Sequence, residues 1–404
     1  MEISPVTLEI LKVIRKSQRA VSKAELVKLT NYSLATVTEH TELLLRNNLI
    51  IEKERGPSTG GRKPILLSFN VDLGYIIAVD LESTHVKVGI ANLNCDLLIS
   101  ESTTDIDVSS GPTVVLEKIK EIAFNLMKKI GILHHQIKGI GMGLPGPVRF
   151  REGIPASLAI MPGWENYKVR EFWRQYFDCP CFVDNNVNTM ALAELARNAD
   201  TAYKNFIYVK IGNGIGASII YNGQIYRGSN EFAGNIGHIN IGHDELCYCG
   251  NRGCLEALAG GRAIAKRAEQ LARSGKSEFL KKILEEKNKL TLADVRQAVT
   301  ESDPVAVELM RECGNLIGNV LAGLVNFANP SCIYINGAVS QVGDVLLAAI
   351  RQSVYQHSLP LMTRNLTILH SSLGENAGII GAAVLIADEI ISRNFIENHL
   401  REEV

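Results

Sequence analysis

The sequence predicts an α/β protein in which an N-terminal winged helix-turn-helix unit precedes a duplicated, two-lobed body with a metal-binding loop. Three observations lead to this prediction. Positive charge is concentrated in residues 1–70, where short helices precede a hairpin. Two similar sets of strands and glycine-rich turns follow in the rest of the chain. Cys247, Cys249 and Cys254, three of the eight cysteines, lie within eight positions.

Length and composition are those of a folded protein with two or three domains. The chain has 404 residues, of which 46% are hydrophobic and 21% charged, which excludes a disordered or low-complexity protein. The formal charge is +4 for residues 1–70 and −5 for the remainder, a distribution typical of a nucleic-acid-binding module joined to a different kind of domain. We find no signal peptide and no apolar run of about 18 residues. The sequence therefore predicts a cytoplasmic protein that does not insert into membranes.

The basic unit begins with three short helices. Ser4-Pro5 is typical of a helix start, because proline suits the first helical position. Ser22 and Glu25 form a capping box before the second helix, and Ser33 caps the third. Residues 49–53 and 63–70 alternate as two strands around a basic, glycine-rich wing. This order of elements is that of a winged helix-turn-helix.

In such modules the third helix enters the major groove of DNA, and basic side chains on the wing contact phosphates or the minor groove. The alternative is a small helical interaction domain whose charges are merely solvated. The residues predicted to contact DNA are Ser33, Thr36, Thr38, His40, Arg55, Arg62 and Lys63.

The body contains two sets of strands. The first set is expected at residues 75–80, 86–92 and 97–101, and the second at 205–211, 217–221 and 224–227. A glycine-rich turn, Gly212 to Gly216, follows the first strand of the second set, and such turns commonly approach phosphates through their amides. An ordinary hairpin turn is the alternative. Repetition of the same unit predicts a duplicated fold with a cleft between two lobes.

The clustered cysteines predict a closed, structural zinc site. Three thiolates and one histidine make a four-coordinate ligand set that leaves no position for water. Gly250 and Gly253 allow the chain to turn tightly between the cysteines. Buried free thiols or a disulfide are the alternatives, and a protein without an export signal disfavours the disulfide. The fourth ligand is His238 or His243, of which His243 is nearer in sequence.

The chain resembles the ROK family of repressors, open reading frames and sugar kinases, and specifically the repressor branch with an added winged helix. The resemblance runs from about residue 8 to 390. It rests on the segments Gly141–Pro147, Asp184–Asn188, His238–Glu256, Ile335–Ser340 and Gly374–Gly378, and on Ser58–Pro64 at the wing. It implies an actin-like, sugar-kinase fold and favours His238 as the fourth zinc ligand. It also implies a sugar site at Asn185, Asn186, Asn235, His238 and Glu256, of which Glu256 could alternatively support the zinc loop.

Three positions depart from the pattern of the kinases in this family. Their phosphate turn, Asp-x-Gly-Gly-Thr, corresponds to Asp80-Leu-Glu82-Ser-Thr, which lacks both glycines and adds a carboxylate that opposes phosphate. Their general base corresponds to Asn186, whose carboxamide cannot accept a proton. Their sugar-binding glutamate corresponds to Asn235. The departures predict a protein with no catalytic residues, which does not use ATP.

The resemblance therefore implies a repressor that responds to a sugar or sugar phosphate, binds an operator as a homodimer or tetramer, and controls genes of carbohydrate use. The alternatives are a sugar kinase that also binds DNA, and a repressor controlled by a protein partner. We expect the DNA-binding domain at 1–70 and the first lobe at 71–190, with the C-terminal helix, 385–404, packed on it. The second lobe, with the zinc loop and the dimer surface, is expected at 191–384.

Overall fold

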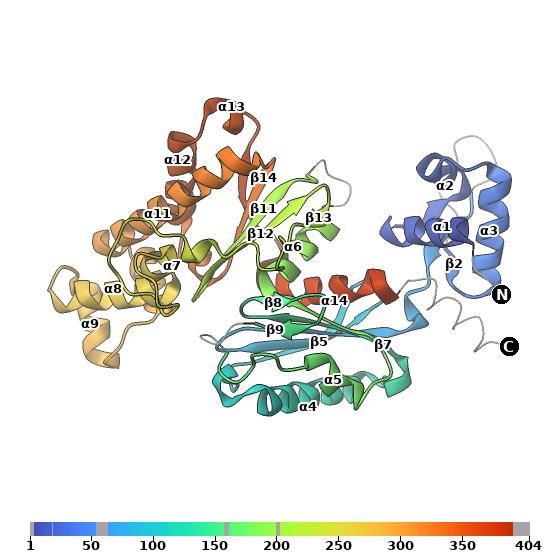
Figure 1. Ribbon diagram of the computed structural model, residues 1–404, viewed down its shortest axis with the longest axis horizontal. Helices are drawn as coiled ribbons and strands as arrows, with labels where there is room; N and C mark the ends of the chain where they lie inside the picture. Colours follow the sequence, from blue (N-terminus) through green and yellow to red (C-terminus); the bar gives the residue numbers. More distant parts are fainter. Residues whose placement is uncertain (1–3, 18, 54–63, 157–160, 199–202, 391–404) are drawn as a thin grey trace.

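The computed structural model describes residues 4–17, 19–53, 64–156, 161–198 and 203–390 (Figure 1). An N-terminal unit, drawn in blue, lies beside the first of two larger lobes. As far as these residues show, each lobe is built on one five-stranded sheet. In the part of the chain that the structure describes, no helix has both the length and the apolar character needed to cross a bilayer.

In residues 4–17, 19–53 and 64–69, the N-terminal unit has three helices and a three-stranded sheet of order β1-β3-β2. Serine side chains begin all three helices: Ser4, Ser22 and Ser33 each accept a hydrogen bond from a backbone amide of the first turn. Ser22 forms the expected capping box with Glu25. The elements are α1 (Pro5–Lys16), β1 (Val21–Ser22), α2 (Lys23–Thr30), α3 (Leu34–Arg46), β2 (Ile50–Lys53) and β3 (Leu66–Phe69).

The first lobe contains a sheet of order β10-β7-β4-β5-β6. Helix α4 covers one face of this sheet, and α6 and α14 lie on the other side (Figure 1). Trp164 is fully buried and donates its indole N–H to Val108, so it packs in the core of this lobe. The elements are β4 (Tyr75–Leu81), β5 (Val86–Asn92), β6 (Leu97–Thr103), α4 (Pro112–Ile130), β7 (Ile137–Leu144), β8 (Val148–Arg149), β9 (Ile154–Pro155), α5 (Val169–Arg174), β10 (Cys181–Asn185) and α6 (Asn186–Arg197).

The second lobe repeats the topology of the first. Its sheet has the order β13-β12-β11-β14-β15, so in each lobe the first strand pairs antiparallel with the second and parallel with the fourth. The elements are β11 (Phe206–Ile211), β12 (Ile215–Tyr221), β13 (Gln224–Ile225), α7 (Leu255–Ala259), α8 (Gly261–Arg273), α9 (Glu278–Lys287), α10 (Leu292–Thr300), α11 (Pro304–Ala328), β14 (Cys332–Asn336), α12 (Asp344–His357), α13 (Pro360–Thr363) and β15 (Thr367–His370).

Helix α14 (Ala377–Ile390) returns the chain to the first lobe, where it packs against β7 and α6. The contacts are close enough to exclude side chains: a Cβ at Gly141 would lie 1.8 Å from the Ala382 carbonyl oxygen, and one at Gly381 would lie 1.7 Å from that of Thr189. The helix begins at residue 377, eight positions before the start predicted from the sequence. Its start was hard to predict because it is apolar on several faces and lacks the usual amphipathic period.

The N-terminal unit contacts the turn between β5 and β6 through α1. Arg15, of which only 8% is exposed, donates its Nε–H to the Leu93 carbonyl oxygen at 3.1 Å. Ile10 and Ile14 on the same helix belong to a hydrophobic cluster that also contains Ile76 and Leu93 of the first lobe. The N-terminal unit, called the head below, and the first lobe therefore share a packed core.

Candidate functional site

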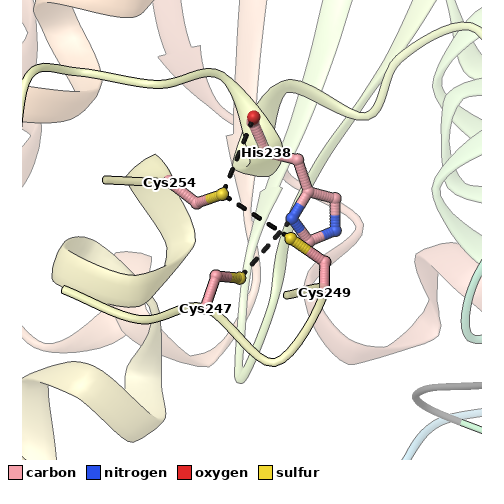
Figure 2. Close-up of side chains that lie close together, drawn as sticks. All are labelled: His238, Cys247, Cys249 and Cys254. Carbon is pink, nitrogen blue, oxygen red and sulfur yellow. Dashed lines mark hydrogen bonds between the residues drawn. The ribbon is translucent and has the colours of Figure 1, made fainter. Parts of the chain in front are cut away.

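Four side chains of the second lobe converge on one point: those of His238, Cys247, Cys249 and Cys254 (Figure 2). Their candidate ligand atoms all lie within 4.8 Å of one another. The His238 Nδ1 atom lies 3.7 Å from the Cys247 sulfur, and the sulfurs of Cys249 and Cys254 are also 3.7 Å apart. Tetrahedral zinc would separate such pairs by roughly 3.6 Å and 3.8 Å. The donor set and its geometry therefore fit a structural zinc ion.

Backbone geometry explains why the thiols converge. Gly250 and Gly253 have φ angles of 90° and 71°, in the left-handed region that other residues rarely adopt. A Cβ at Gly253 would lie 2.3 Å from the His243 carbonyl oxygen, so this turn requires glycine. His243 itself lies outside the cluster, with its Nδ1 atom 3.8 Å from a Glu245 oxygen. The histidine that the structure brings to the cysteines is His238.

Glu256, the second residue of α7, connects the cysteine-rich loop of residues 247–254 to the glycine turn of the second lobe. Its carboxylate accepts a hydrogen bond from the Ile215 amide at 2.6 Å. A Cβ at Gly214 or Gly237 would lie 2.7 Å or 3.1 Å from a Glu256 oxygen, which shows how closely both backbones approach this carboxylate. Asn235 lies two residues before Gly237. Its side chain is exposed and donates a hydrogen bond to the Phe232 carbonyl oxygen.

The first lobe contributes Asn185 and Asn186, which lie where β10 ends and α6 begins. Asn185 caps α6 by accepting from the Val187 amide at 2.8 Å, and it donates to the Gly146 carbonyl at 2.7 Å. Asn186 is 3% exposed. Val187 reaches the second lobe, because a Cβ at Gly216 would lie 3.1 Å from its Cγ2 atom. The predicted sugar-binding residues thus come from both lobes, on either side of this contact.

Among the described residues, three ion pairs that the sequence did not indicate join the lobes. The most exposed of them joins Arg151 to Glu231 at 3.2 Å. Glu82, at the end of β4, pairs with Lys210 of β11 at 2.5 Å, with side-chain exposures of 19% and 11%. Asp184 of β10 pairs with Arg227 at 2.6 Å, and the Arg227 guanidinium also stacks 3.8 Å from the Phe150 ring centroid. The carboxylate of Glu82 therefore lies next to β11, the strand that leads into the glycine turn of the second lobe. Its negative charge is neutralised there by Lys210.

Asp80 is buried beside the Glu82–Lys210 pair, with 5% of its surface exposed and one carboxylate oxygen without a hydrogen-bond partner. Burial, and then the negative charge of Glu82, raise the pKa of Asp80 to about 7, while Lys210 opposes this rise. Because unfolded aspartate has a pKa of about 3.9, unfolding releases a proton between these two values, and Asp80 makes the protein less stable as pH rises from about 4 to about 7.

Asp80→Asn removes this titration and preserves the shape of the side chain. We therefore expect the melting temperature of the variant, relative to wild type, to rise steadily between pH 5 and pH 7.5 and to level off above that range. Thermal unfolding followed by circular dichroism across this pH series measures the difference. A difference that stays constant with pH would show that Asp80 is ionised throughout.

The predicted DNA-contacting residues fall into three groups. Ser33 and Thr36 form the cap of α3, where the Ser33 oxygen accepts from the Thr36 amide at 3.1 Å, and Thr38 is partly exposed on the next turn. The His40 ring is held against α1, with Nδ1 2.8 Å from the Thr7 hydroxyl oxygen. The basic wing residues lie outside the described residues: Arg55, Arg62 and Lys63.

Comparison with known proteins gives a consistent result. The sequence profile described as the ROK family matches residues 76–389. A putative xylose repressor of Caldicellulosiruptor sp. strain Rt8B.4 is 30% identical over 387 residues, which cover 95% of this chain and 96% of the relative. A glucokinase of Halalkalibacterium halodurans is 33% identical over 262 residues, covering 63% of this chain and 79% of that enzyme. Among solved structures, a ROK family transcriptional regulator, a homologue of the Escherichia coli MLC protein, matches with a TM-score of 0.79 and 25% identity, over 98% of both chains.

Proposed function

The chain belongs to the ROK family, and we propose that it is a sugar-responsive transcriptional repressor whose kinase-like body binds its effector without phosphorylating it. The observation that carries the proposal is the buried amide of Asn186 at the position where the family's kinases have their general base. An amide can hydrogen-bond a sugar hydroxyl but cannot take its proton. The match to a repressor over nearly the whole chain supports the same conclusion.

The surroundings of the former phosphate turn also argue against nucleotide binding. Glu82 adds a carboxylate beside the second-lobe glycine turn and occupies the amine of Lys210, a group that could otherwise meet a phosphate. A nucleotide would have to break this pair and would then meet the Glu82 charge. We infer that ATP is not a ligand.

We propose that the winged helix is the DNA reader, with α3 in the major groove and the wing on the backbone. The exposed cap of α3 and the positive charge of residues 1–70 support this assignment. A homodimer, or a tetramer built from dimers, would then recognise an inverted repeat with half-sites about one or two helical turns apart.

We also propose that zinc, bound by His238 and the three cysteines, is a structural cofactor. When bound, it holds the loop closed and fixes the His238 ring and the start of α7, where Glu256 lies. Effector affinity would therefore depend on the metal, although the metal itself would not contact the DNA.

Communication between the proposed effector site and DNA requires that the effector binds one arrangement of the lobes better than another. The pairs Glu82–Lys210 and Asp184–Arg227 span the lobes, so a change in lobe closure must rearrange them. The Arg15–Leu93 contact then couples the first lobe to α1 of the head. The proposed path runs from the proposed effector site through the first lobe and α1 to α3, the proposed DNA-recognition helix.

The test combines DNA binding with a kinase assay. Operator fragments selected from random DNA by the purified protein are expected to bind with a Kd of about 10 nM or below, and one sugar or sugar phosphate from a panel is expected to weaken binding about tenfold or more. The panel contains D-xylose, D-glucose, N-acetyl-D-glucosamine and their phosphates. In a coupled assay none of the free sugars should cause ATP turnover. Turnover near 1 s⁻¹ or faster would instead establish a kinase that binds DNA, and DNA release by a protein but by no sugar would favour control by a partner.

A further inference from the structure

A short segment of the second lobe, residues 227–231, lies against the hairpin formed by β8 and β9, on the side of the first lobe that faces the second (Figure 1). Glu231 contacts the hairpin twice. One carboxylate oxygen accepts a hydrogen bond from the Arg151 amide at 3.1 Å, and the other pairs with the Arg151 guanidinium at 3.2 Å. Arg227 contacts the preceding residue, with its guanidinium 3.8 Å from the centroid of the Phe150 ring. Two neighbouring residues of the hairpin are thus held by one segment of the other lobe.

Each side of this contact is fixed within its own lobe. In the first lobe, Arg170 of α5 donates to two carbonyl oxygens of the hairpin, at 2.9 Å and 2.8 Å. In the second lobe, the Ala233 amide donates to the Arg227 carbonyl oxygen at 2.9 Å and closes the segment into a turn. Glu231 has a φ angle of 67° in this turn, a conformation that persists only where the surrounding structure fixes it. The contact between the lobes therefore joins two ordered parts.

The two ion pairs of this contact have opposite polarity. Arg227 of the second lobe pairs with Asp184 of the first, whereas Glu231 of the second lobe pairs with Arg151 of the first. A shift of one lobe along the other would separate both pairs, and like charges that met after such a shift would repel each other. The pattern of charges therefore specifies one arrangement of the lobes.

The Asp184–Arg227 pair also reaches the proposed effector site. Its side chains are 2% and 22% exposed, so solvent screens this pair only weakly. The other Asp184 carboxylate oxygen accepts hydrogen bonds from the Asn185 amide at 2.7 Å and from the Asn188 side chain at 2.8 Å. Through Asp184, Arg227 thus holds the start of α6, where the proposed sugar-binding residues Asn185 and Asn186 lie. Arg227 is a positioning residue for these two side chains.

We propose that hairpin β8–β9 and residues 227–231 form an interlobe clasp, which stabilises the arrangement of the lobes that binds the effector. This inference rests on the proposed function. A sugar that enters between the lobes requires the clasp to open and close again. The free energy of the clasp is gained only in the closed arrangement, so weakening the clasp lowers the population that can bind the sugar. The apparent affinity for the sugar then falls by the same factor.

The experiment reverses the charges of the Arg151–Glu231 pair, because the Arg151 side chain is 89% exposed and its replacement leaves the core intact. Arg151→Glu and Glu231→Arg each place like charges together, and we expect each to weaken binding of the effector about three- to tenfold. The double variant restores opposite charges and should bind more tightly than either single variant. Arg151→Gln, in which the charge is removed but not reversed, should lie between wild type and Arg151→Glu. Binding is measured by calorimetry with D-xylose, D-glucose, N-acetyl-D-glucosamine and their phosphates.

Salt separates the effect of charge from that of altered structure. At about 1 M NaCl the difference in affinity between Arg151→Glu and wild type should fall below about twofold, because salt screens exposed charges. Lys168→Glu is the matched control. Lys168 is an exposed basic residue of the first lobe whose partner, Glu171, belongs to the same lobe, so this variant should bind the effector as wild type does.

An unchanged affinity in the Arg151 and Glu231 variants would overturn this inference and leave the proposed function intact. A double variant that binds no better than the single variants, or a loss that persists at high salt, would overturn it in the same way. If wild type bound none of these sugars and sugar phosphates, the proposed function would fail together with the clasp.

Discussion

Replacing Ala35 by glutamate is expected to lower the affinity for operator DNA about 100-fold or more without loss of folding. Ala35 is the second residue of α3, is exposed, and lies on the turn proposed to meet base edges. A carboxylate there would face the negative charge of the duplex and would remain unpaired when desolvated. A negative charge in the first turn of a helix interacts favourably with the positive end of the helix dipole, so the variant should be at least as stable as wild type. Fluorescence anisotropy with a labelled operator at fixed salt measures the effect.

Ala293→Glu is the matched control for this variant. Ala293 is the second residue of α10, is likewise exposed, and follows a threonine cap, but it lies in the second lobe. The Ala293→Glu variant should bind the operator with the affinity of wild type. Equal losses of operator affinity in the two variants would mean that the added negative charge acts through the net charge of the whole protein. An unchanged affinity of Ala35→Glu would show that α3 is not part of the DNA interface.

Cys254→Ser is expected to abolish stoichiometric zinc binding and, with it, measurable sugar binding. Cys254 is fully buried, is the N-cap residue of α7, and would supply one of the four ligands. Structural zinc sites contribute on the order of 10 kcal/mol to folding of the segments they close, so loss of one ligand is a large change. The loop, His238 and Glu256 would no longer be held together. Zinc content, the melting temperature and calorimetric titration with the effector sugar are the measurements.

Cys313→Ser separates the loss of a ligand from the cost of a buried hydroxyl. Cys313 is also fully buried, but it lies in α11, outside the four-residue cluster. This variant should lose some stability, keep its zinc and bind the sugar as wild type does. Retention of zinc by Cys254→Ser, or equal zinc loss in both variants, would contradict the proposed ligand set.

Local signals predicted much of the fold because the physics that creates them is local. The serine caps of the three head helices could be predicted from residues within one turn of each helix. The convergence of the three cysteines was also predictable, since glycines between closely spaced cysteines leave few ways to place three thiols. Spacing alone did not decide between His238 and His243. Only resemblance to a family favoured His238, and the structure brings that residue to the cysteines.

Contacts between the lobes could not be predicted in the same way. Glu82 could be recognised as a carboxylate at a position where the resemblance places the kinases' phosphate turn, but its partner lies 128 positions later, in a strand that is otherwise apolar. That isolated Lys210 was the available signal, because a lysine is rarely buried without a counter-charge.

The return of the chain through α14 constrains how the two halves can move. The backbone leaves the first sheet after α6 and comes back between β15 and α14, so two covalent crossings join the halves. These two crossings define a hinge axis. The motion that leaves both crossings in place is a rotation of one lobe relative to the other about that axis. Rotation about any other axis would strain the crossings, since the second crossing ends at α14, which is fixed in the first lobe where Gly381 lies against the Thr189 backbone. The connectivity of the chain therefore favours one hinge rotation of the two lobes over other relative motions.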